Sequence, residues 1–345
     1  MTVRKTFRAS ALRRFGQCFA TFVVLLTINE AAAPPPHAFA QTPHMEARTV
    51  SGSQSATLKT VQSLLAAAPT IKTLPTNLQP SLRDLENDNG QYWASTRGCY
   101  PVTPDKYAAI TSACTFGDKA SRDVIVLSGD SHAAMWINAI DRIGKQTHKK
   151  VILFWLGNCG VAAQSVVRYW SFSARTVNQA CAPWQDFVLG RVKALRPETL
   201  ILSSSISSNV EGPGTTLNPH QWTRGMSVAL TSFKQAAPRA SIVVLGSTPD
   251  FGLSVPQCLA FHQTDVQTCS APRKDAYLVA LNDANFLATK QIGASYIDVM
   301  PWFCSTVCTD VVGNMAVYSG GGHISATYAT FLSGVLGSAL ARSTK

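Results

Sequence analysis

The sequence predicts a single α/β domain built on a mostly parallel sheet that helices cover on both faces. Short apolar runs rich in β-branched residues alternate with segments of helical periodicity, and no internal repeat or second domain interrupts the alternation. Composition agrees with this class, because 46% of the 345 residues are hydrophobic and 14% are charged. Such a balance is typical of a globular chain and excludes a disordered one.

Five apolar runs are expected to form strands, and helical patterns separate them along the chain. The expected strands are 123–127, 150–155, 199–202, 241–245 and 294–299. The expected helices are 132–145, 183–195, 221–235, 275–291 and 325–340. Strands that alternate with helices in this way favour a parallel sheet covered on both faces.

Residues 1–40 have the pattern of a signal peptide. A basic region ends at Arg14, an apolar stretch runs from Phe15 to Ile28, and Ala38-Phe39-Ala40 forms a small-x-small cleavage site. The apolar stretch is shorter than the roughly 20 residues of a spanning helix, although an uncleaved membrane anchor is an alternative. Residues 41–98 are then expected to be a mobile lead-in, helical near 58–67, and a linker arm, ahead of a domain spanning 99–345.

The cysteines also point to export. Of nine cysteines, Cys18 lies in the signal region, and the other eight form neighbouring couples that predict sequential disulfides. The predicted pairs are Cys99–Cys114, Cys159–Cys181, Cys258–Cys269 and Cys304–Cys308. Spacing alone does not fix connectivity, since eight cysteines allow many pairings. Zinc is the weaker interpretation, because only Cys304 and Cys308 have metal-ligand spacing and no second close pair lies nearby. We therefore expect no metal and no cofactor.

The formal net charge is +11, part of which lies in the first 40 residues. A moderately basic surface favours anionic partners such as acidic glycans or membrane headgroups. Nucleic acid is not an expected partner, because no run of Lys and Arg is interleaved with aromatic residues and the protein is predicted to be exported.

Ser131 is the candidate nucleophile. It follows the strand 123–127 and opens the next helix, and ligands of parallel sheets bind at the carboxyl ends of strands. The backbone N–H of Ser131 at the helix start is also a candidate donor to an oxyanion. A serine hydroxyl needs a base to take its proton. The alternative is a structural one, in which Ser131 only caps the helix.

His323 is the candidate base, because it follows the glycine run 320–322 and precedes the last helix. The remaining histidines are less suitable. His132 adjoins the nucleophile and is expected to point elsewhere on the helix, whereas the others lie in the signal, the lead-in, surface turns or a disulfide-bounded loop. The pairing of Ser131 with His323 is more specific than either residue alone.

These residues resemble the SGNH (GDSL-like) hydrolase superfamily. The sequence is similar, over residues 74–342, to the extracytoplasmic SGNH domain fused to the membrane acyltransferase-3 domain of bacterial polysaccharide O-acyltransferases. The resemblance lies in Leu127-Ser128-Gly129-Asp130-Ser131-His132, Leu74-Pro75, Pro80-Ser81-Leu82, Cys99 and Cys114 with Phe116-Gly117-Asp118, Cys159, Cys181, Pro256-Gln257-Cys258-Leu259 and 298–304. It implies a flavodoxin-like α/β/α SGNH fold with Ser131 as nucleophile and His323 as base.

The sequence departs from the family at Gly320. The family's last block is Asp-x-x-His, and its aspartate orients the histidine, but Gly320 stands at that position. Three alternatives follow: a Ser–His dyad held by a backbone carbonyl, a substitute carboxylate from Asp298 or Asp310, or lost catalysis. Of the two aspartates, Asp298 is the candidate for the third member of a triad with Ser131 and His323. Gly157, Gly160, Asn158 and Asn209 are the further oxyanion candidates, and the last two have no clear family match.

The resemblance implies an exported serine enzyme, an O-acyltransferase or O-acyl esterase that works on a cell-envelope or extracellular polysaccharide through an acyl-serine. The expected partners are an acylated glycan or acyl donor and a separate membrane acyltransferase, since no acyltransferase-3 domain occurs in this sequence. The expected location is periplasmic or secreted. The alternative function is an impaired SGNH-like glycan-binding or accessory module.

Overall fold

A computed structural model describes residues 56–100, 107, 110–171, 176–205, 218–250, 252, 254–320 and 322–344. All of them belong to one compact unit, which comprises residues 46–345. The predicted signal peptide, with Cys18, lies outside the described residues, and so does Asn209.

The centre of the fold is a six-stranded sheet of order β1-β3-β2-β6-β7-β9. Its strands are β1 (Thr115–Gly117), β2 (Val124–Gly129), β3 (Lys150–Trp155), β6 (Thr199–Ser203), β7 (Ser241–Leu245) and β9 (Ser295–Ile297). Only β1 pairs antiparallel, at one edge, and the other five are parallel. Every residue of β2 and β6 is buried, which is why these strands are apolar throughout rather than alternating.

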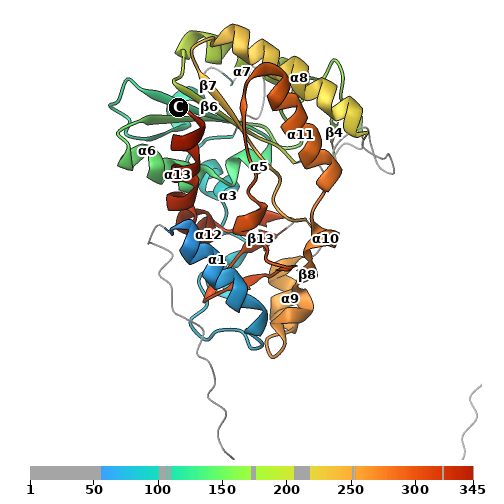
Figure 1. Cartoon of the computed structure of the whole chain (residues 1–345). Helices are drawn as coiled ribbons and strands as arrows, with labels where there is room; N and C mark the ends of the chain where they lie inside the picture. The colour runs from blue at the N-terminus through green and yellow to red at the C-terminus, as the bar shows by residue number, and fades with distance from the viewer. Residues whose placement is uncertain are drawn as a thin grey trace, which may run out of the picture. The chain divides into compact units, whose positions relative to one another are not determined.

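Helices cover both faces of this sheet, so the predicted α/β class with a mostly parallel sheet is confirmed (Figure 1). The helices α6 (Ile137–Gln146) and α13 (Ser333–Ser343) lie on one face, against β1 and β3 and against β7 and β9 respectively. The other face carries α7 (Cys181–Leu195), α8 (Pro219–Ala236) and α11 (Val279–Ile292), which pack on one another in that order. The core therefore lies in two layers, one on each side of the strands.

Three predicted helices are each interrupted in the structure. The segment 132–145 forms α5 (Ser131–Ala134) and α6, 275–291 forms α10 (Arg273–Ala276) and α11, and 325–340 forms α12 (Ala326–Phe331) and α13. At the second break Tyr277 has extended backbone angles, φ −108° and ψ 115°. Hydrophobic periodicity continues across such breaks, because the flanking turns bury the same face, and it therefore does not reveal them.

The N-terminal segment differs from the expected mobile lead-in over residues 56–70, because its helix packs into the core. The helix α1 (Leu58–Ala67) spans the residues expected to be helical, and it buries Val61, Leu64 and Leu65 in the core. Spacings of three and four residues place these side chains on one face, and that apolar face packs against the domain. The N–H of Ala56 also donates to the carbonyl of Phe331 at 2.9 Å.

The arm that follows is tied to the domain by backbone hydrogen bonds. Gln79 N–H donates to Asn314 O at 2.8 Å, and Ala316 N–H donates to Gln79 O at 3.0 Å. Beyond it, α3 (Gly90–Ser95) approaches α5 so closely that a Cβ on Gly90 would lie 2.1 Å from the Ala134 carbonyl oxygen. Glycine is required at this position, and the arm thereby supports the short helix that begins with Ser131.

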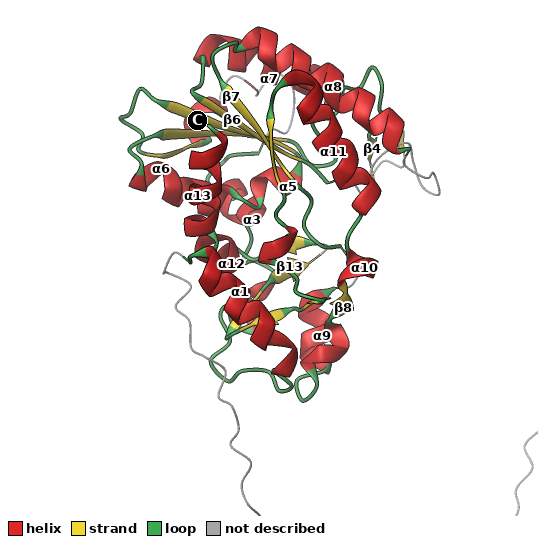
Figure 2. Cartoon of the chain, in the orientation of Figure 1, coloured by secondary structure: helices red, strands yellow, loops and turns green. Residues whose placement is uncertain are grey.

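The smaller elements gather mainly in the lower half of Figures 1 and 2, apart from the β4–β5 hairpin near α8 and α11. Four two-stranded ribbons pair β4 with β5, β8 with β10, β11 with β12 and β13 with β14. Their bounds are β4 (Trp170–Ser171), β5 (Thr176–Val177), β8 (Ala271–Pro272), β10 (Val307–Cys308), β11 (Val311–Val312), β12 (Met315–Ala316), β13 (Tyr318–Gly320) and β14 (His323–Ile324). The short helices are η1 (Ala68–Thr70), α2 (Leu82–Leu85), α4 (Ile110–Ala113), α9 (Val255–Phe261), η3 (Val266–Cys269) and η4 (Met300–Trp302).

Four disulfides staple the loops, and they join the pairs that the sequence spacing predicts: Cys99–Cys114, Cys159–Cys181, Cys258–Cys269 and Cys304–Cys308. Each closes a loop of modest length, and in the chain-entropy model a loop of about 15 residues contributes roughly 3 kcal/mol. Within the described part of the chain, no helix is both long and apolar enough to cross a membrane.

Candidate active site

Ser131 lies where β2 turns into α5, at the centre of the sheet. Gly129 ends β2 with φ +150°, and a Cβ there would lie 1.8 Å from the carbonyl oxygen of Ser203 on β6. Only glycine allows the two strands to approach this closely at that backbone angle. The chain then turns at Asp130, the residue preceding α5, and presents Ser131 as the first residue of the helix.

Asp130 fixes the shape of this turn from inside the protein. Its Oδ1 accepts the N–H of His132 at 2.8 Å, and its carboxylate accepts the N–H of Ser205, beyond β6, at 2.8 Å for Oδ2 and 3.1 Å for Oδ1. The side chain is buried, and desolvation raises the pKa of Asp130 to about 7 against the lowering effect of these hydrogen bonds. Asp130 thus positions the backbone on both sides of Ser131.

His323 reaches Ser131 from the β13–β14 ribbon. Its Nε2 lies 2.9 Å from Ser131 Oγ, within hydrogen-bond distance. The two residues are 192 positions apart in the chain, and both side chains are half-buried. The sheet supplies the serine and the ribbon supplies the histidine, so the contact depends on the tertiary fold alone.

The second ring nitrogen of His323 faces a backbone carbonyl rather than a carboxylate. Nδ1 lies 3.1 Å from the carbonyl oxygen of Gly320. A carbonyl oxygen only accepts, so Nδ1 carries the proton of the neutral ring and donates it there. Nε2 is then left with its lone pair directed at Ser131, and the serine O–H donates to it. The Gly320 carbonyl therefore selects the tautomer that a general base needs.

The surroundings of His323 favour its neutral form. Burial lowers the pKa of His323, and this outweighs the raising effects of the Gly320 hydrogen bond and the charge of Asp250. His132 packs beside it, with the two ring centroids 4.9 Å apart. The expectation that His132 points elsewhere is therefore wrong: α5 is short, and its second residue turns inward. Burial also holds the pKa of His132 well below its usual range, so this ring is neutral as well.

The carboxylates expected as substitutes for the missing acid have other surroundings. Asp298 follows β9, and its Oδ1 accepts the N–H of Met300 at 3.0 Å. Asp310 is buried, its carboxyl oxygens have no hydrogen-bond partner among the described residues, and burial raises its pKa well above the usual value. Neither aspartate contacts His323 Nδ1, whose partner within the described chain is Gly320. Both aspartates are candidates because their segments lie near His323 in the sequence. In the structure, the β13–β14 ribbon turns Nδ1 of His323 toward the Gly320 carbonyl instead.

The loop that follows β3 contains three of the oxyanion candidates, and it begins beside the end of β2, the strand that leads to Ser131. The N–H of Leu156 donates to Gly129 O at 3.2 Å, which places the start of the 156–161 loop next to the end of β2. Asn158 has φ +58°, and its carbonyl accepts the side-chain amide of Asn178 at 3.1 Å. Gly160 is packed against Tyr169, where a Cβ would lie 2.8 Å from the Tyr169 hydroxyl. Gly157, Asn158, Gly160 and the N–H of Ser131 stay candidates for this role.

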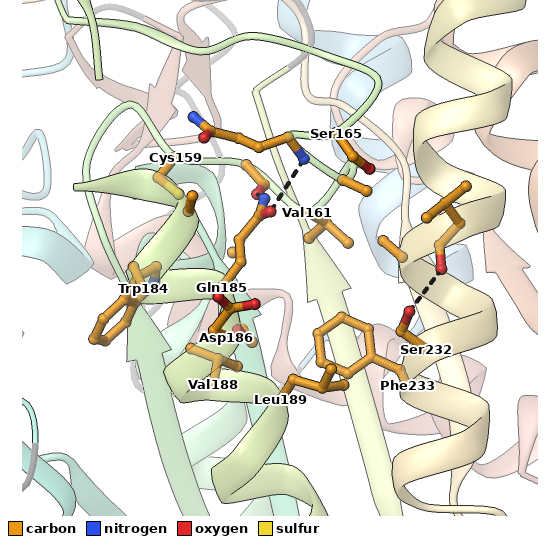
Figure 3. A pocket seen from close by; sticks show the side chains of 18 residues that line it. Cys159, Val161, Ser165, Trp184, Gln185, Asp186, Val188, Leu189, Ser232 and Phe233 are labelled. Atoms are coloured by element: carbon orange, nitrogen blue, oxygen red, sulfur yellow. Dashed lines mark hydrogen bonds between the residues drawn. The ribbon is translucent and has the colours of Figure 1, made fainter. Parts of the chain in front are cut away.

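A cavity of about 330 Å³ opens on the side of the sheet that α7 and α8 cover (Figure 3). Ser128 and Gly129 of β2 are among its lining residues, but Ser131 and His323 are not. The cavity is mostly apolar, and the residues labelled in Figure 3 are Cys159, Val161, Ser165, Trp184, Gln185, Asp186, Val188, Leu189, Ser232 and Phe233. It is separate from the reacting pair and adjoins the strand that carries it.

A backbone carbonyl as the partner of His323 is one of the three predicted alternatives, and the structure identifies it as that of Gly320. Two features of this site are absent from the sequence predictions: the inward position of His132 and the approach of Asp250. A carbonyl leaves no trace in residue identity, and Asp250 comes from a loop distant in sequence. Asp130 lies inside the Gly-Asp-Ser motif, but its two backbone partners become apparent only once β6 is in place. Among the described residues, no cluster of three or more His, Cys, Asp or Glu side chains is arranged to hold a metal ion.

In a comparison with protein families, the family described as the SGNH domain fused to AT3 domains matches residues 79–337, well over half of this chain. No significant match was found among curated protein sequences. Among solved structures, the periplasmic domain of a lipopolysaccharide acetyltransferase from Salmonella ser. Paratyphi A has a TM-score of 0.57 at 17% identity, covering 76% of this chain and 98% of that one.

Two family-two carbohydrate esterases are more distant. The enzyme from Cellvibrio japonicus has a TM-score of 0.41 at 14% identity, with 64% of this chain and 61% of that chain covered. The enzyme from Corynascus thermopiles has a TM-score of 0.39 at 14% identity, with 65% and 67% covered. The Salmonella domain is the neighbour that supports the fold described above.

Proposed function

The chain belongs to the family of SGNH domains that are fused to AT3 domains, and on this basis we propose that it is an exported O-acyl enzyme whose nucleophile is Ser131 and whose base is His323. At the coarser level, the family makes it a protein of the acyl esterase or acyltransferase kind. The observation that carries the proposal is the 2.9 Å contact between Ser131 Oγ and His323 Nε2.

The first half of the reaction forms an acyl-serine. Ser131 Oγ attacks the carbonyl carbon of an acyl ester while its proton passes to His323 Nε2. The tetrahedral intermediate then collapses, the bond to the leaving alkoxide breaks, and His323 returns the proton to that oxygen. The acyl group is now an ester of Ser131, and the base is again neutral.

The second half repeats these steps with a different oxygen nucleophile. A water molecule or a sugar hydroxyl loses its proton to His323 Nε2, attacks the acyl-serine and releases Ser131, which recovers the proton. Water makes the protein an esterase, and a sugar hydroxyl makes it a transferase. We propose transfer onto a cell-envelope or extracellular polysaccharide, because the family domain is fused to AT3 domains and the Salmonella neighbour is named as a lipopolysaccharide acetyltransferase.

The absence of an aspartate at position 320 does not remove the function of the base. In the serine-protease template, replacing the aspartate by asparagine costs about 10⁴ in rate because it produces the wrong histidine tautomer. Here the Gly320 carbonyl holds the productive tautomer, so that penalty is avoided. The remaining cost is weaker stabilisation of the imidazolium, since a carbonyl dipole attracts a positive ring less than a full charge does.

The four disulfides support an extracytoplasmic location, which we propose to be periplasmic or secreted. We propose that a membrane acyltransferase or another acyl donor supplies the acyl group, because SGNH domains of this family are fused to AT3 domains. A moderately basic chain, with net charge +11, is suited to an anionic glycan acceptor.

The test is labelling of the purified protein with a fluorophosphonate probe, together with turnover of p-nitrophenyl acetate. We expect labelling of Ser131 and ester turnover in the wild type, and loss of both in Ser131→Ala. Ser338→Ala, which alters an exposed serine of α13, is the matched control and should behave as wild type. If the wild type is neither labelled nor active, the chain is a non-catalytic glycan-binding or accessory module instead.

A further inference from the structure

A carboxylate approaches His323 from an element that the sequence does not associate with it. Asp250 follows β7, and its Oδ1 accepts the N–H of Gly252 at 3.1 Å while its own N–H donates to Ala276 O at 3.1 Å. These hydrogen bonds hold the loop in a defined position at the carboxyl end of the sheet. The loop thus follows β7 of the central sheet, whereas the acid of the family's Asp-x-x-His block would come from the β13–β14 ribbon.

The contact is made at Gly322, the residue immediately before His323. A Cβ on Gly322 would lie 3.4 Å from Asp250 Cγ and 3.6 Å from its Oδ1, and Gly322 has φ +75°. In addition, Thr248 Oγ1 donates to the Gly322 carbonyl at 3.1 Å. The glycine therefore leaves the carboxylate against the bare backbone of the ribbon, and the threonine fastens the same loop to it.

We propose that Asp250 is the positioning residue that replaces the missing acid of the Asp-x-x-His block, acting on His323 through its charge and through its packing against Gly322. The proposal rests on the function proposed above and specifies how the same site operates. In this arrangement the Gly320 carbonyl selects the tautomer of His323, and Asp250 stabilises the positively charged ring that forms during each proton transfer.

Two titratable side chains, Asp250 and His132, are relevant to this effect. Asp250 raises the pKa of His323, whereas the neighbouring His132, itself neutral because of burial, contributes no opposing charge at neutral pH. Ser131 faces the other ring nitrogen of His323. Asp298 and Asp310 are not among the groups that shift the pKa of His323. An isosteric change at Asp250 therefore isolates the charge.

The test is Asp250→Asn, because an asparagine retains an oxygen that can accept from Gly252 and loses only the charge. We expect the pKa of His323, measured by NMR titration of its ring, to fall by roughly half a unit to one unit. The kcat on p-nitrophenyl acetate should fall by roughly three- to tenfold with KM unchanged, since one pKa unit corresponds to a tenfold change. Asp250→Glu should restore part of both values.

Asp298→Asn is the matched control, because it removes a charge at another strand end and should leave the pKa of His323 and kcat unaltered. The proposal for Asp250 is overturned if Asp250→Asn leaves the titration of His323 unchanged, or if Asp298→Asn shifts it as much. The titration does not require turnover. An inactive wild type with the expected shift would therefore contradict the proposed function and leave the role of Asp250 intact.

Discussion

The carboxyl end of β2 and the β13–β14 ribbon meet at one hydrogen bond, but they are held by different means. On the β2 side, a buried carboxylate, Asp130, accepts three hydrogen-bond contacts from two backbone N–H groups, and Gly129 fits against the carbonyl of Ser203 without room for a side chain. On the ribbon side, His323 is oriented by one carbonyl, and a Cβ on Gly320 would meet nothing within 4 Å. The serine is thus fixed by close packing, and the histidine is held in more open surroundings.

This difference indicates which side tolerates change. Packing and buried hydrogen bonds around Ser131 leave no alternative arrangement, so substitutions there affect both folding and chemistry. The open space beside Gly320 and the approach of Asp250 indicate that the orientation of the base can be supplied in more than one way. The predictions that follow test this comparison, beginning with the largest effect.

Removal of either member of the reacting pair is expected to have the largest effect. Ser131→Ala and His323→Ala should each lower kcat/KM for an acyl ester on the order of 10³-fold or more, because the nucleophile and its base act as one unit. The double variant should lose little beyond either single one. His262→Ala, at an exposed histidine, is the control. Additive losses in the double variant would show that the residues act independently.

Asp130→Asn should destabilise the β2 side. The amide nitrogen takes the place of Oδ2, so the N–H of Ser205 loses its 2.8 Å acceptor, faces a donor, and keeps only the 3.1 Å contact with Oδ1, which it shares with His132. We expect this to cost about 2 kcal/mol of unfolding free energy. Denaturant titration of wild type and variant at one pH measures this directly. A variant as stable as wild type would show that Asp130 does not determine the turn.

Asp310 is a buried aspartate that contrasts with Asp130, since its carboxyl has no hydrogen-bond partner in the described structure. The substitution Asp310→Asn tests this difference. Burial raises its folded pKa well above the usual value, so the folded protein binds a proton that the unfolded chain releases. Stability from this group is therefore present at low pH and lost as the pH rises above about 4. Relative to wild type, Asp310→Asn should gain stability between pH 4 and pH 7, measured as the pH dependence of unfolding. A relative loss over that interval would contradict a neutral Asp310.

Gly320→Asp tests the open side by restoring the acid of the family block. The space is free, but the φ of +142° is one that side chains rarely adopt, so we expect a loss of about 1 to 3 kcal/mol in stability. Gly320→Ala should lose the same amount of stability but adds no charge, so it is the control for strain at this position. Only the aspartate variant should raise the pKa of His323. Equal His323 titrations in the two variants would mean that an acid at position 320 does not reach the ring.

The smallest expected effect is a shift in the acid limb of the pH–rate profile. Because burial lowers the pKa of His323 from 6.5, its base form persists to lower pH than that of a free histidine. The acid limb of kcat/KM should therefore have its midpoint below pH 6.5, measured with a neutral ester. A midpoint above 6.5 would indicate that a carboxylate in close contact, rather than burial, dominates the surroundings of the ring.

Much of the fold could be predicted from the sequence, because buried parallel strands need continuous apolar residues. The runs 150–155 and 241–245 are the strands β3 and β7 without change. The helix breaks at Met135 and Tyr277 could not be predicted, since the apolar periodicity continues across them. A composition rich in Ala, Ser, Thr and Gln predicts a mobile lead-in over residues 41–70, yet Val61 and Leu64 make α1 part of the core.

In the site, a strand-to-helix turn and a histidine before the last helix sufficed to select the two residues that lie 2.9 Å apart. A backbone carbonyl could be named as one of three alternatives for orienting His323, but not which carbonyl it is, because every residue type carries one. The approach of Asp250 could not be predicted, because it depends on how the loop after β7 packs in the folded protein. From the sequence, Asp298 and Asp310 are the candidate substitutes for the missing acid only because their segments lie near His323 in the chain.

The most direct test of the account is to trap the acyl-enzyme. The protein is mixed with p-nitrophenyl acetate, quenched with acid within the first turnover, digested, and examined by mass spectrometry. We expect a burst of p-nitrophenol and one acetyl group on the peptide that contains Ser131, with neither present in Ser131→Ala. Turnover without any adduct, or an acetyl group on a different residue, would contradict a Ser131 nucleophile activated by His323.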